Sequence, residues 1–228
     1  MNEFLLDNPA WSALTTEHAD FAMGTARAKR YRPGVLPFTA CRQPQEEGIS
    51  ELAPWMAGGE NFYIIGALPP ALPPHWTVEH ELPCAQMLLQ QPPRQQETDA
   101  GIVLLGPEDA EVMYQLINLV QPGYYNMDTR LLGTYFGIKQ EGELVAMAGE
   151  RMRMTGFSEL SAICTHPQHT GRGYAQRLIT ALCNRHAEKG ITSFLHVALT
   201  NDRAIRLYEH MGFVQRRVIS FYRVRVKA

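Results

Sequence analysis

The sequence predicts an α/β protein with a mixed sheet covered by helices, and three observations support that class. The second half of the chain follows the order helix, hairpin, strand, helix, strand, helix, strand, which is typical of helices packed on a sheet. Glycines and prolines stand between these segments, where elements end. Of the 228 residues, 45% are hydrophobic and 19% charged, which is ordinary globular usage and supplies enough apolar surface for a core.

The first half of the chain has weaker patterns. Helical segments are predicted at residues 8–22 and 50–56. The aromatic and β-branched run NFYIIGAL at 61–68 predicts a strand. A further strand is predicted at 75–90, although its alternation of apolar and polar residues is lost after His80. The first half is therefore expected to form a small α/β unit.

A polar, proline-containing stretch separates the two halves. Residues 92–99, PPRQQETD, have the composition of a linker. We therefore predict two domains, a smaller α/β domain over residues 1–97 and a larger one over residues 98–228.

The second half begins with a predicted helix and a hairpin. Residues 106–120 open with Gly-Pro-Glu-Asp and continue with apolar residues at helical spacing. Two strands at 134–139 and 144–154 are joined by the turn Gln-Glu-Gly-Glu. A third strand is predicted at 159–165.

The remaining elements follow in the same alternation. A helix after residue 173 should end at Gly190, a typical C-terminal cap. Residues 192–200 are apolar on both faces, which predicts a buried central strand. Residues 201–212 form a short helix, with Asn201 or Asp202 as its N-cap. Residues 213–226 alternate and close the sheet with one or two strands.

Charge and cysteine usage exclude several classes of protein. The formal charge is −2 and no run of five or more like charges occurs, so neither a nucleic acid nor a membrane surface is an expected partner. No apolar stretch approaches the roughly 20 residues of a membrane span, and the N-terminus lacks a signal-peptide pattern. The four cysteines, with no Cys-x-x-Cys pair, indicate free thiols. We therefore expect a cytoplasmic protein, either a monomer or a homodimer.

The stretch THPQHTGRGYAQRL at 165–178 has the composition of an anion site. The first N–H groups of a helix lack intrahelical partners, and the helix dipole adds positive potential there. Gly171 and Gly173 allow close approach of a phosphate, and Arg172 adds a charge. A plain strand-to-helix connection also uses glycine, so the pattern alone leaves both interpretations open. The stretch lacks the Gly-Lys-Ser/Thr of a P-loop, and Gln176 replaces the third glycine of the dinucleotide fingerprint.

The combination of two motifs resembles the GNAT superfamily of N-acetyltransferases over roughly residues 100–228. The family pattern Gln/Arg-x-x-Gly-x-Gly/Ala is matched at residues 170–175, with Thr170 in place of the first residue. The later pattern Asn-x-x-Ala-x-x-Leu-Tyr-x-x-x-Gly-Phe is matched at residues 201–213. The resemblance implies a GNAT-type, mostly antiparallel mixed sheet flanked by helices. The first half is similar only in organisation to the degenerate N-terminal half of glycine N-acyltransferase-like members.

The resemblance also implies a reaction and a site. It implies direct transfer of an acetyl group from acetyl-CoA to a primary amine, in a ternary complex and without an acyl-enzyme. Tyr208 is implied to protonate the departing CoA sulfur, and Asn201 to bind the pantetheine arm. The other cofactor-binding residues implied are Ile163, Cys164, Thr165, Thr170, Gly171, Arg172, Gly173, Tyr174 and Ala175.

Some of these residues have simpler interpretations. Tyr208 could be a core tyrosine, and Asn201 only an N-cap. Cys164 is expected to be a small buried apolar residue rather than a nucleophile. His166 and His169 form an H-x-x-H pair without further nearby ligands, so no metal is expected.

Glu159 is the leading candidate for the base that takes the amine proton. Its spacing from Gly173 resembles that of the glutamate base in the histone-acetylating branch of the family. Glu150 is the rival candidate, and a chain of waters could also carry the proton. A competing class of function is a non-catalytic acyl-CoA-binding or sensing module. Retention of Tyr208 favours the enzyme.

Overall fold

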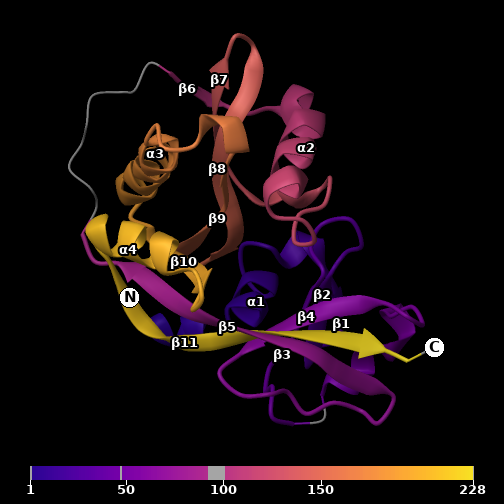
Figure 1. Ribbon diagram of the computed structural model, residues 1–228. Coiled ribbons are helices and arrows are strands. Elements are labelled where there is room, and N and C mark those ends of the chain that lie inside the picture. Colours follow the sequence, from indigo (N-terminus) through magenta and orange to yellow (C-terminus); the bar gives the residue numbers. More distant parts are fainter. Residues whose placement is uncertain (1, 47, 92–100, 228) are drawn as a thin grey trace.

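The structure is a computed structural model that describes residues 2–46, 48–91 and 101–227. Within these residues one sheet contains eleven strands in the order β1-β2-β3-β4-β11-β5-β10-β9-β8-β7-β6. Neighbouring strands run antiparallel except for the pairs β3–β4 and β9–β10. The predicted α/β class, with a mixed and mostly antiparallel sheet flanked by helices, is confirmed (Figure 1).

The strands of the first half are β1 (Ala22–Gly24), β2 (Ala28–Tyr31), β3 (Phe38–Cys41), β4 (Asn61–Gly66) and β5 (Trp76–Leu89). Those of the second half are β6 (Ile102–Leu104), β7 (Tyr135–Gln140), β8 (Glu143–Met154), β9 (Phe157–Thr165), β10 (Thr192–Ala198) and β11 (Phe213–Val226). The α-helices are α1 (Pro9–Leu14), α2 (Ala110–Val120), α3 (Tyr174–Glu188) and α4 (Asp202–His210). The helices and strands predicted for the second half are therefore all present, and residues 213–226 form one strand.

The two helices predicted in the first half are shorter or tighter than expected. Helix α1 ends at Leu14 because hydroxyl groups compete for its last carbonyls: Thr15 Oγ1 donates to Trp11 O at 2.8 Å and Thr16 Oγ1 to Ser12 O at 2.6 Å. The segment at 49–55 is a 3₁₀-helix that contains Pro54, whose missing N–H is incompatible with an α-helical interior.

Strand β5 joins the two halves of the chain into one sheet. It precedes the predicted linker, yet it lies between β10 and β11 and pairs with both in antiparallel register. Strand β4 pairs with the other edge of β11, so β11 is flanked on both sides by strands of the first half. The division at residue 97 stays a prediction, and the linker itself lies outside the described residues.

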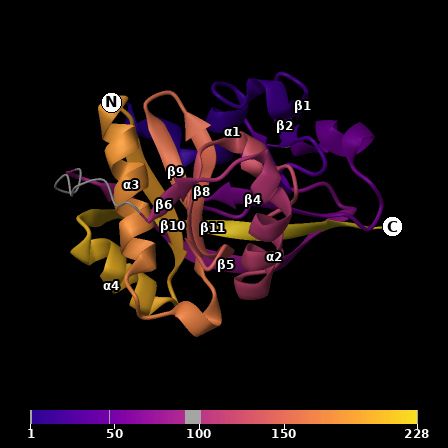
Figure 2. The same cartoon turned by 90° about the horizontal axis from the view of Figure 1, so that it is seen from above.

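Helices cover both faces of the sheet around β8 and β9. Figures 1 and 2 show α3 on one face and α2 on the other. Leu178, Ile179 and Leu182 of α3 are fully buried, and Met113 and Leu116 of α2 are buried against the opposite face. This packing fixes β9 between two rigid helices, and β9 carries much of the candidate site.

Candidate functional site

The site begins where two parallel strands separate. Strands β9 and β10 pair only over Phe157–Glu159 and Thr192–Phe194. Beyond these pairs β9 has a register irregularity against β8 and contains Ala162 at φ +50°, which is unusual for a residue other than glycine. The local kink turns β9 away from β10. The separated strand edges carry backbone N–H and C=O groups that are available to a ligand.

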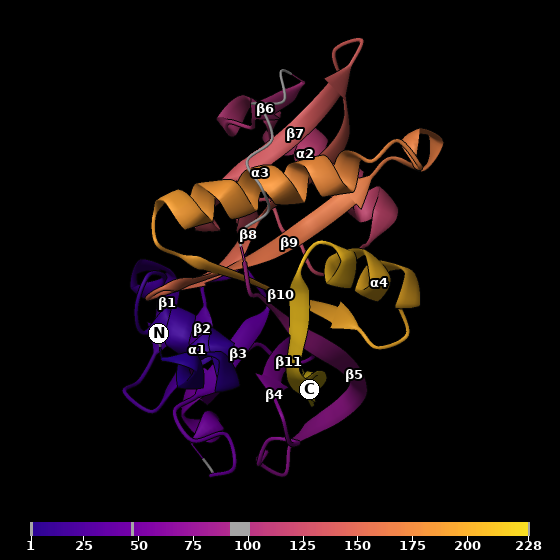
Figure 3. The ribbon, with the colours of Figure 1, turned by 90° about the vertical axis from the view of Figure 1, so that its left-hand side faces the viewer.

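A cavity of about 860 Å³ occupies this split and extends to the N-terminal ends of α3 and α4. Both helices begin on the same side of the molecule (Figure 3). The lining contains Tyr208, which the family resemblance implies as the acid, and all the residues that it implies for cofactor binding. These are Ile163, Cys164, Thr165, Thr170, Gly171, Arg172, Gly173, Tyr174, Ala175 and Asn201. The structure therefore brings two distant motifs to one cavity, while the roles of their residues stay predictions.

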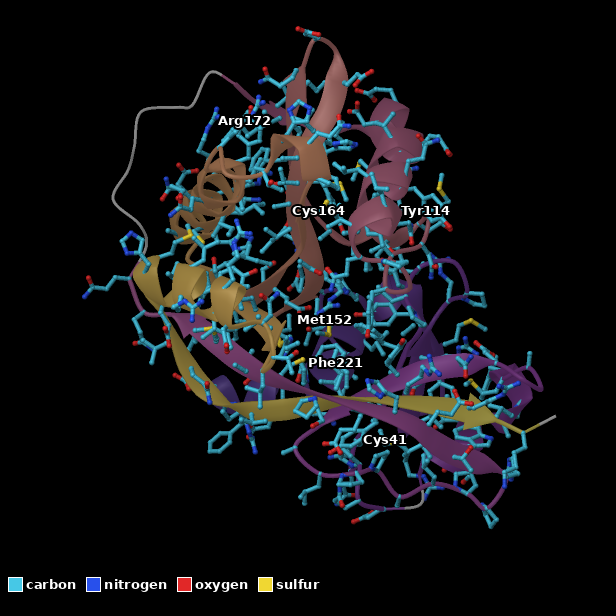
Figure 4. All side chains as sticks on the ribbon, in the orientation of Figure 1. Cys41, Tyr114, Met152, Cys164, Arg172 and Phe221 are labelled. Atoms are coloured by element: carbon cyan, nitrogen blue, oxygen red, sulfur yellow. The ribbon has the colours of Figure 1, made fainter. Side chains whose placement is uncertain are left out.

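The loop before α3 has open space where a phosphate would need it. Gly173 is the N-cap of α3 at φ +73°, and Gly171 has φ +79°, values that favour glycine. A Cβ atom built at Gly171 would meet nothing within 4 Å, and one at Gly173 only Gln176 Oε1 at 3.8 Å. Arg172 stands on this loop, away from the core (Figure 4). Backbone conformation and space are thus compatible with the predicted anion cradle.

Thr170 does not replace the side-chain contact of the usual Gln or Arg. Its hydroxyl donates to Pro167 O at 3.2 Å, within the same loop. His166 Nδ1 accepts from the N–H of Gln168 at 3.3 Å. Among the described residues no group of three or more His, Cys, Asp or Glu side chains has the geometry to hold a metal ion.

Tyr208 lies in the wall of the cavity with its ring packed on Phe213, the ring centroids being 6.0 Å apart. The side chain is 9% exposed. Burial raises the pKa of Tyr208 to about 12, so the hydroxyl keeps its proton at neutral pH and can donate a hydrogen bond.

Asn201 is both an N-cap and a cavity residue. Its Oδ1 accepts from the N–H of Ala204 at 3.1 Å, as predicted for an N-cap. Because only the oxygen is used, the amide Nδ2 can still donate to a ligand.

Cys164 has the character predicted for a buried apolar residue. It is 4% exposed, and burial raises the pKa of its thiol to about 12, so little thiolate is present at neutral pH. Figure 4 places Cys164 on β9 between α3 and α2. All four cysteines are buried free thiols, as the sequence predicted.

Glu159 is fully buried and is not part of the cavity lining. Its carboxylate accepts from Arg151 Nε at 2.9 Å and Nη2 at 2.5 Å, and from His196 Nδ1 at 2.7 Å. Burial alone would raise the pKa of this carboxyl, but the Arg151 guanidinium and these hydrogen bonds outweigh it and lower the pKa of Glu159 to about 2. Its role as base stays a prediction, and the geometry leaves it an indirect route through Arg151 or His196, which do line the cavity.

His196 has both ring nitrogens occupied. Because Nδ1–H donates a hydrogen bond to Glu159, Nε2 is left to accept one from Gln86 Nε2 at 3.1 Å. Gln86 Nε2 also donates to Leu6 O at 2.8 Å, and Gln86 Oε1 accepts from Arg216 Nη1 at 2.9 Å. A hydrogen-bonded chain from β11 and β5 therefore holds His196 in one tautomer.

Glu150, the rival base, lies in a separate buried network. Ser158 Oγ donates to it at 2.7 Å and His186 Nε2 lies 2.9 Å away, while the N–H of Thr134 donates at 2.5 Å. Burial raises its pKa, but these hydrogen bonds outweigh burial and lower it to about 2. Glu150 does not line the cavity.

The first half of the chain packs behind one part of the cavity, which we call the Arg151 end. Its lining includes Tyr124 and Arg151. The Arg151 guanidinium lies 5.2 Å from the ring centroid of Phe38 and 5.4 Å from that of Phe221, both within cation–π range. Figure 4 shows Phe221 at the junction of the two halves. Tyr63 of β4 packs against Tyr124 with centroids 5.2 Å apart.

Two hydrogen bonds tie the loop after α2 to the first half. Thr129 Oγ1 donates to Val35 O at 2.6 Å, and the N–H of Asp128 donates to Gly34 O at 3.1 Å.

The sequence analysis did not identify Arg151, His196 and Tyr124 as residues of the site. The signal available for Arg151 was its place on a predicted strand beside the strand of Glu159, but no signal indicated the contacts with the first half.

Comparison with known proteins identifies the family. Residues 135–224 match the family described as FR47-like protein. A crystal structure of a GNAT-family protein from Novosphingobium aromaticivorans DSM 12444 is 33% identical, with a TM-score of 0.91, and covers 98% of this chain and 99% of that one. A GCN5-related N-acetyltransferase from Kribbella flavida has the same fold at 14% identity, with a TM-score of 0.63 over 96% of this chain and 95% of that one.

The comparison with curated proteins gives no match. Among the described residues no helix is long and apolar enough to cross a membrane. Full-length similarity at 33% identity is decisive for the family: the chain belongs to the GNAT family of acetyltransferases and is an acyltransferase.

Proposed function

We propose that this protein transfers an acetyl group from acetyl-CoA to a primary amine, directly and in a ternary complex. The observation that supports this most strongly is the single cavity that joins the open edge of β9, the glycine loop before α3 and Tyr208 of α4. In this proposal the glycine loop binds the pyrophosphate and β9 pairs with the amides of the pantetheine arm. Asn201 donates from Nδ2 to the same arm.

The thioester carbonyl is placed at the kink of β9. The N–H group of Ile163 lies on the edge of β9 that has separated from β10, so it can donate to the oxyanion of the tetrahedral intermediate. The amine nitrogen forms the new C–N bond, and the C–S bond breaks as the oxyanion collapses. The thiolate leaves beside Tyr208.

The high pKa of Tyr208 shapes its role. A thiol has a pKa of about 8.5, whereas that of Tyr208 is about 12. Complete proton transfer to the thiolate would be uphill by roughly 3.5 pK units, or about 5 kcal/mol. A hydrogen bond from Tyr208 to the developing thiolate carries less cost, and the proton lost by the amine then neutralises the sulfur.

We place the amine at the Arg151 end of the cavity, where it must arrive without its proton. Within the described residues no Asp or Glu side chain lines the cavity. We propose that Glu159 acts indirectly, by holding the Arg151 side chain through Nε and Nη2, so that the remaining guanidinium N–H groups can contact the water through which the proton leaves. The absence of lining carboxylates also disfavours polycationic acceptors. Because Tyr63 and Phe38 pack against Tyr124 and Arg151 at this end, we propose that the first half governs acceptor choice.

Calorimetric titration with acetyl-CoA, CoA and longer acyl-CoAs tests the donor. We expect acetyl-CoA to bind and to raise the thermal midpoint by mass action. Release of free CoA thiol across a panel of amines then tests transfer. Failure to bind any CoA species contradicts the proposal, and binding without turnover over a broad panel contradicts its catalytic part.

We also propose that the protein is located in the cytoplasm. All four of its cysteines are free thiols, as is usual in a reducing compartment.

A further inference from the structure

Helix α4 presents basic side chains to the same cavity. Arg203, Arg206 and His210 all belong to the lining, and their spacing of three and four residues places them on one face of the helix. The two arginines are exposed at the cavity rim, whereas Tyr208 on the same helix is buried deeper. The motif that identified α4 is defined by Asn201, Ala204, Leu207 and Tyr208, so it gives these arginines no role.

These arginines have no carboxylate partner in the part of the chain that the structure describes. Other arginines of this chain are paired: Arg151 with Glu159, Arg217 with Asp7 and Arg30 with Glu60. Like charges three residues apart disfavour a helix, and the described lining offers no Asp or Glu that would neutralise them. An anionic ligand would supply the missing partner.

The glycine loop accounts for only one of the two anionic parts of CoA. Backbone N–H groups and Arg172 suit the pyrophosphate, which lies at the start of α3 in the proposed function. The 3′-phosphate is a separate monoester that carries about −1.5 to −2 charges at pH 7. Because α3 and α4 begin on the same side and share the cavity (Figure 3), a ligand held at α3 extends toward the arginines of α4.

We infer that Arg203 and Arg206 form a second anion site that binds the 3′-phosphate of CoA and selects CoA against donors lacking that group. This inference rests on the proposed function, because it takes CoA as the donor. The discriminating ligand is dephospho-CoA, which keeps the pyrophosphate and the pantetheine arm and lacks only the 3′-phosphate.

The experiment is a calorimetric comparison of CoA with dephospho-CoA. We expect the unmodified protein to bind CoA at least tenfold more tightly, since two charge-assisted contacts are lost with dephospho-CoA. We expect Arg203→Gln and Arg206→Gln each to weaken CoA binding several-fold, and the double variant to bind both ligands equally. Affinity for dephospho-CoA should stay unchanged in all three variants.

Two control variants separate this site from other effects of charge. Arg172→Gln should weaken both ligands by the same factor, because both carry the pyrophosphate. Arg42→Gln removes one charge at an exposed position outside the cavity and should change neither affinity. The difference between the two ligands should also shrink as salt is raised from 0.05 to about 0.5 M, because exposed charges are screened.

Several results would overturn the inference. It is wrong if the unmodified protein binds CoA and dephospho-CoA equally, a comparison that needs no variant to fold. It is also wrong if the α4 variants weaken both ligands equally, or weaken neither. Binding of neither ligand by the unmodified protein would instead contradict the proposed function, and this inference with it.

Discussion

The fragment 98–228, which corresponds to the predicted catalytic domain, should not fold alone. It lacks β5, which pairs with Phe194 to Ala198 of β10 on one edge and with β11 on the other. Met87, Leu88 and Leu89 of β5 are 0%, 6% and 8% exposed. At about 1.5–3 kcal/mol for each buried side chain, their loss removes about 5–9 kcal/mol, comparable with the whole stability of about 5–15 kcal/mol of a typical domain.

Complementation provides the assay. Far-ultraviolet circular dichroism during urea unfolding should show no cooperative transition for the fragment. Addition of a synthetic peptide of residues 75–91 should restore a transition and CoA binding. The same peptide with Met87→Asp serves as the control and should restore neither. A fragment that unfolds cooperatively alone and binds CoA with the affinity of the full chain would refute this reasoning.

Further predictions concern individual side chains. Gly173→Val should abolish CoA binding, because its side chain would fill the open space of the loop and a β-branched residue is strained at φ +73°; normal CoA affinity by calorimetry would contradict the cradle. Tyr208→Phe should keep CoA affinity and lower kcat by about 10²–10³-fold, the typical effect of removing one hydrogen-bond donor to a developing charge, and an unchanged single-turnover rate would reduce Tyr208 to a packing residue. The pKa values of Glu159 and Glu150, both lowered to about 2, predict that stability present above pH 4.5 is lost as pH falls toward 2. Glu159→Gln should lower the free energy of unfolding by about 3–5 kcal/mol, because it leaves Arg151 unpaired. The pH–rate profiles of Glu159→Gln and Glu150→Gln are therefore to be compared at a temperature where both variants are folded. Identical acid-unfolding curves for the variants and the parent would contradict the lowered pKa values of these two carboxyls.

The features that the sequence predicted best are local. The glycine loop and the start of α3 lie within residues 165–178, and the motif on α4 lies within residues 201–213. In both cases the geometry follows from neighbouring residues, since a left-handed glycine and an N-cap need no partner from elsewhere in the chain. The structure adds that the two segments line one cavity.

The features that escaped prediction depend on distant pairing. Strand β5 loses its alternation after His80 because residues 84–89 are buried on both faces, whereas 77–81 are exposed. The loss of period thus marks the point at which β5 enters the centre of the sheet. Nothing in a single sequence shows that Arg151 and Glu159 form an ion pair across strands, or that Tyr63 packs on Tyr124, because such contacts depend on register and topology.

The position of β11 has a consequence for how the chain acquires its structure. Strand β11 follows every other strand in sequence, yet β4 and β5 lie on its two edges. During synthesis both earlier strands would wait with an unpaired edge until β11 is made, and domain-by-domain folding from the N-terminus would be blocked. Contacts of such long sequence separation also slow folding. We expect refolding to be slow and sensitive to protein concentration, because unpaired strand edges favour association between chains.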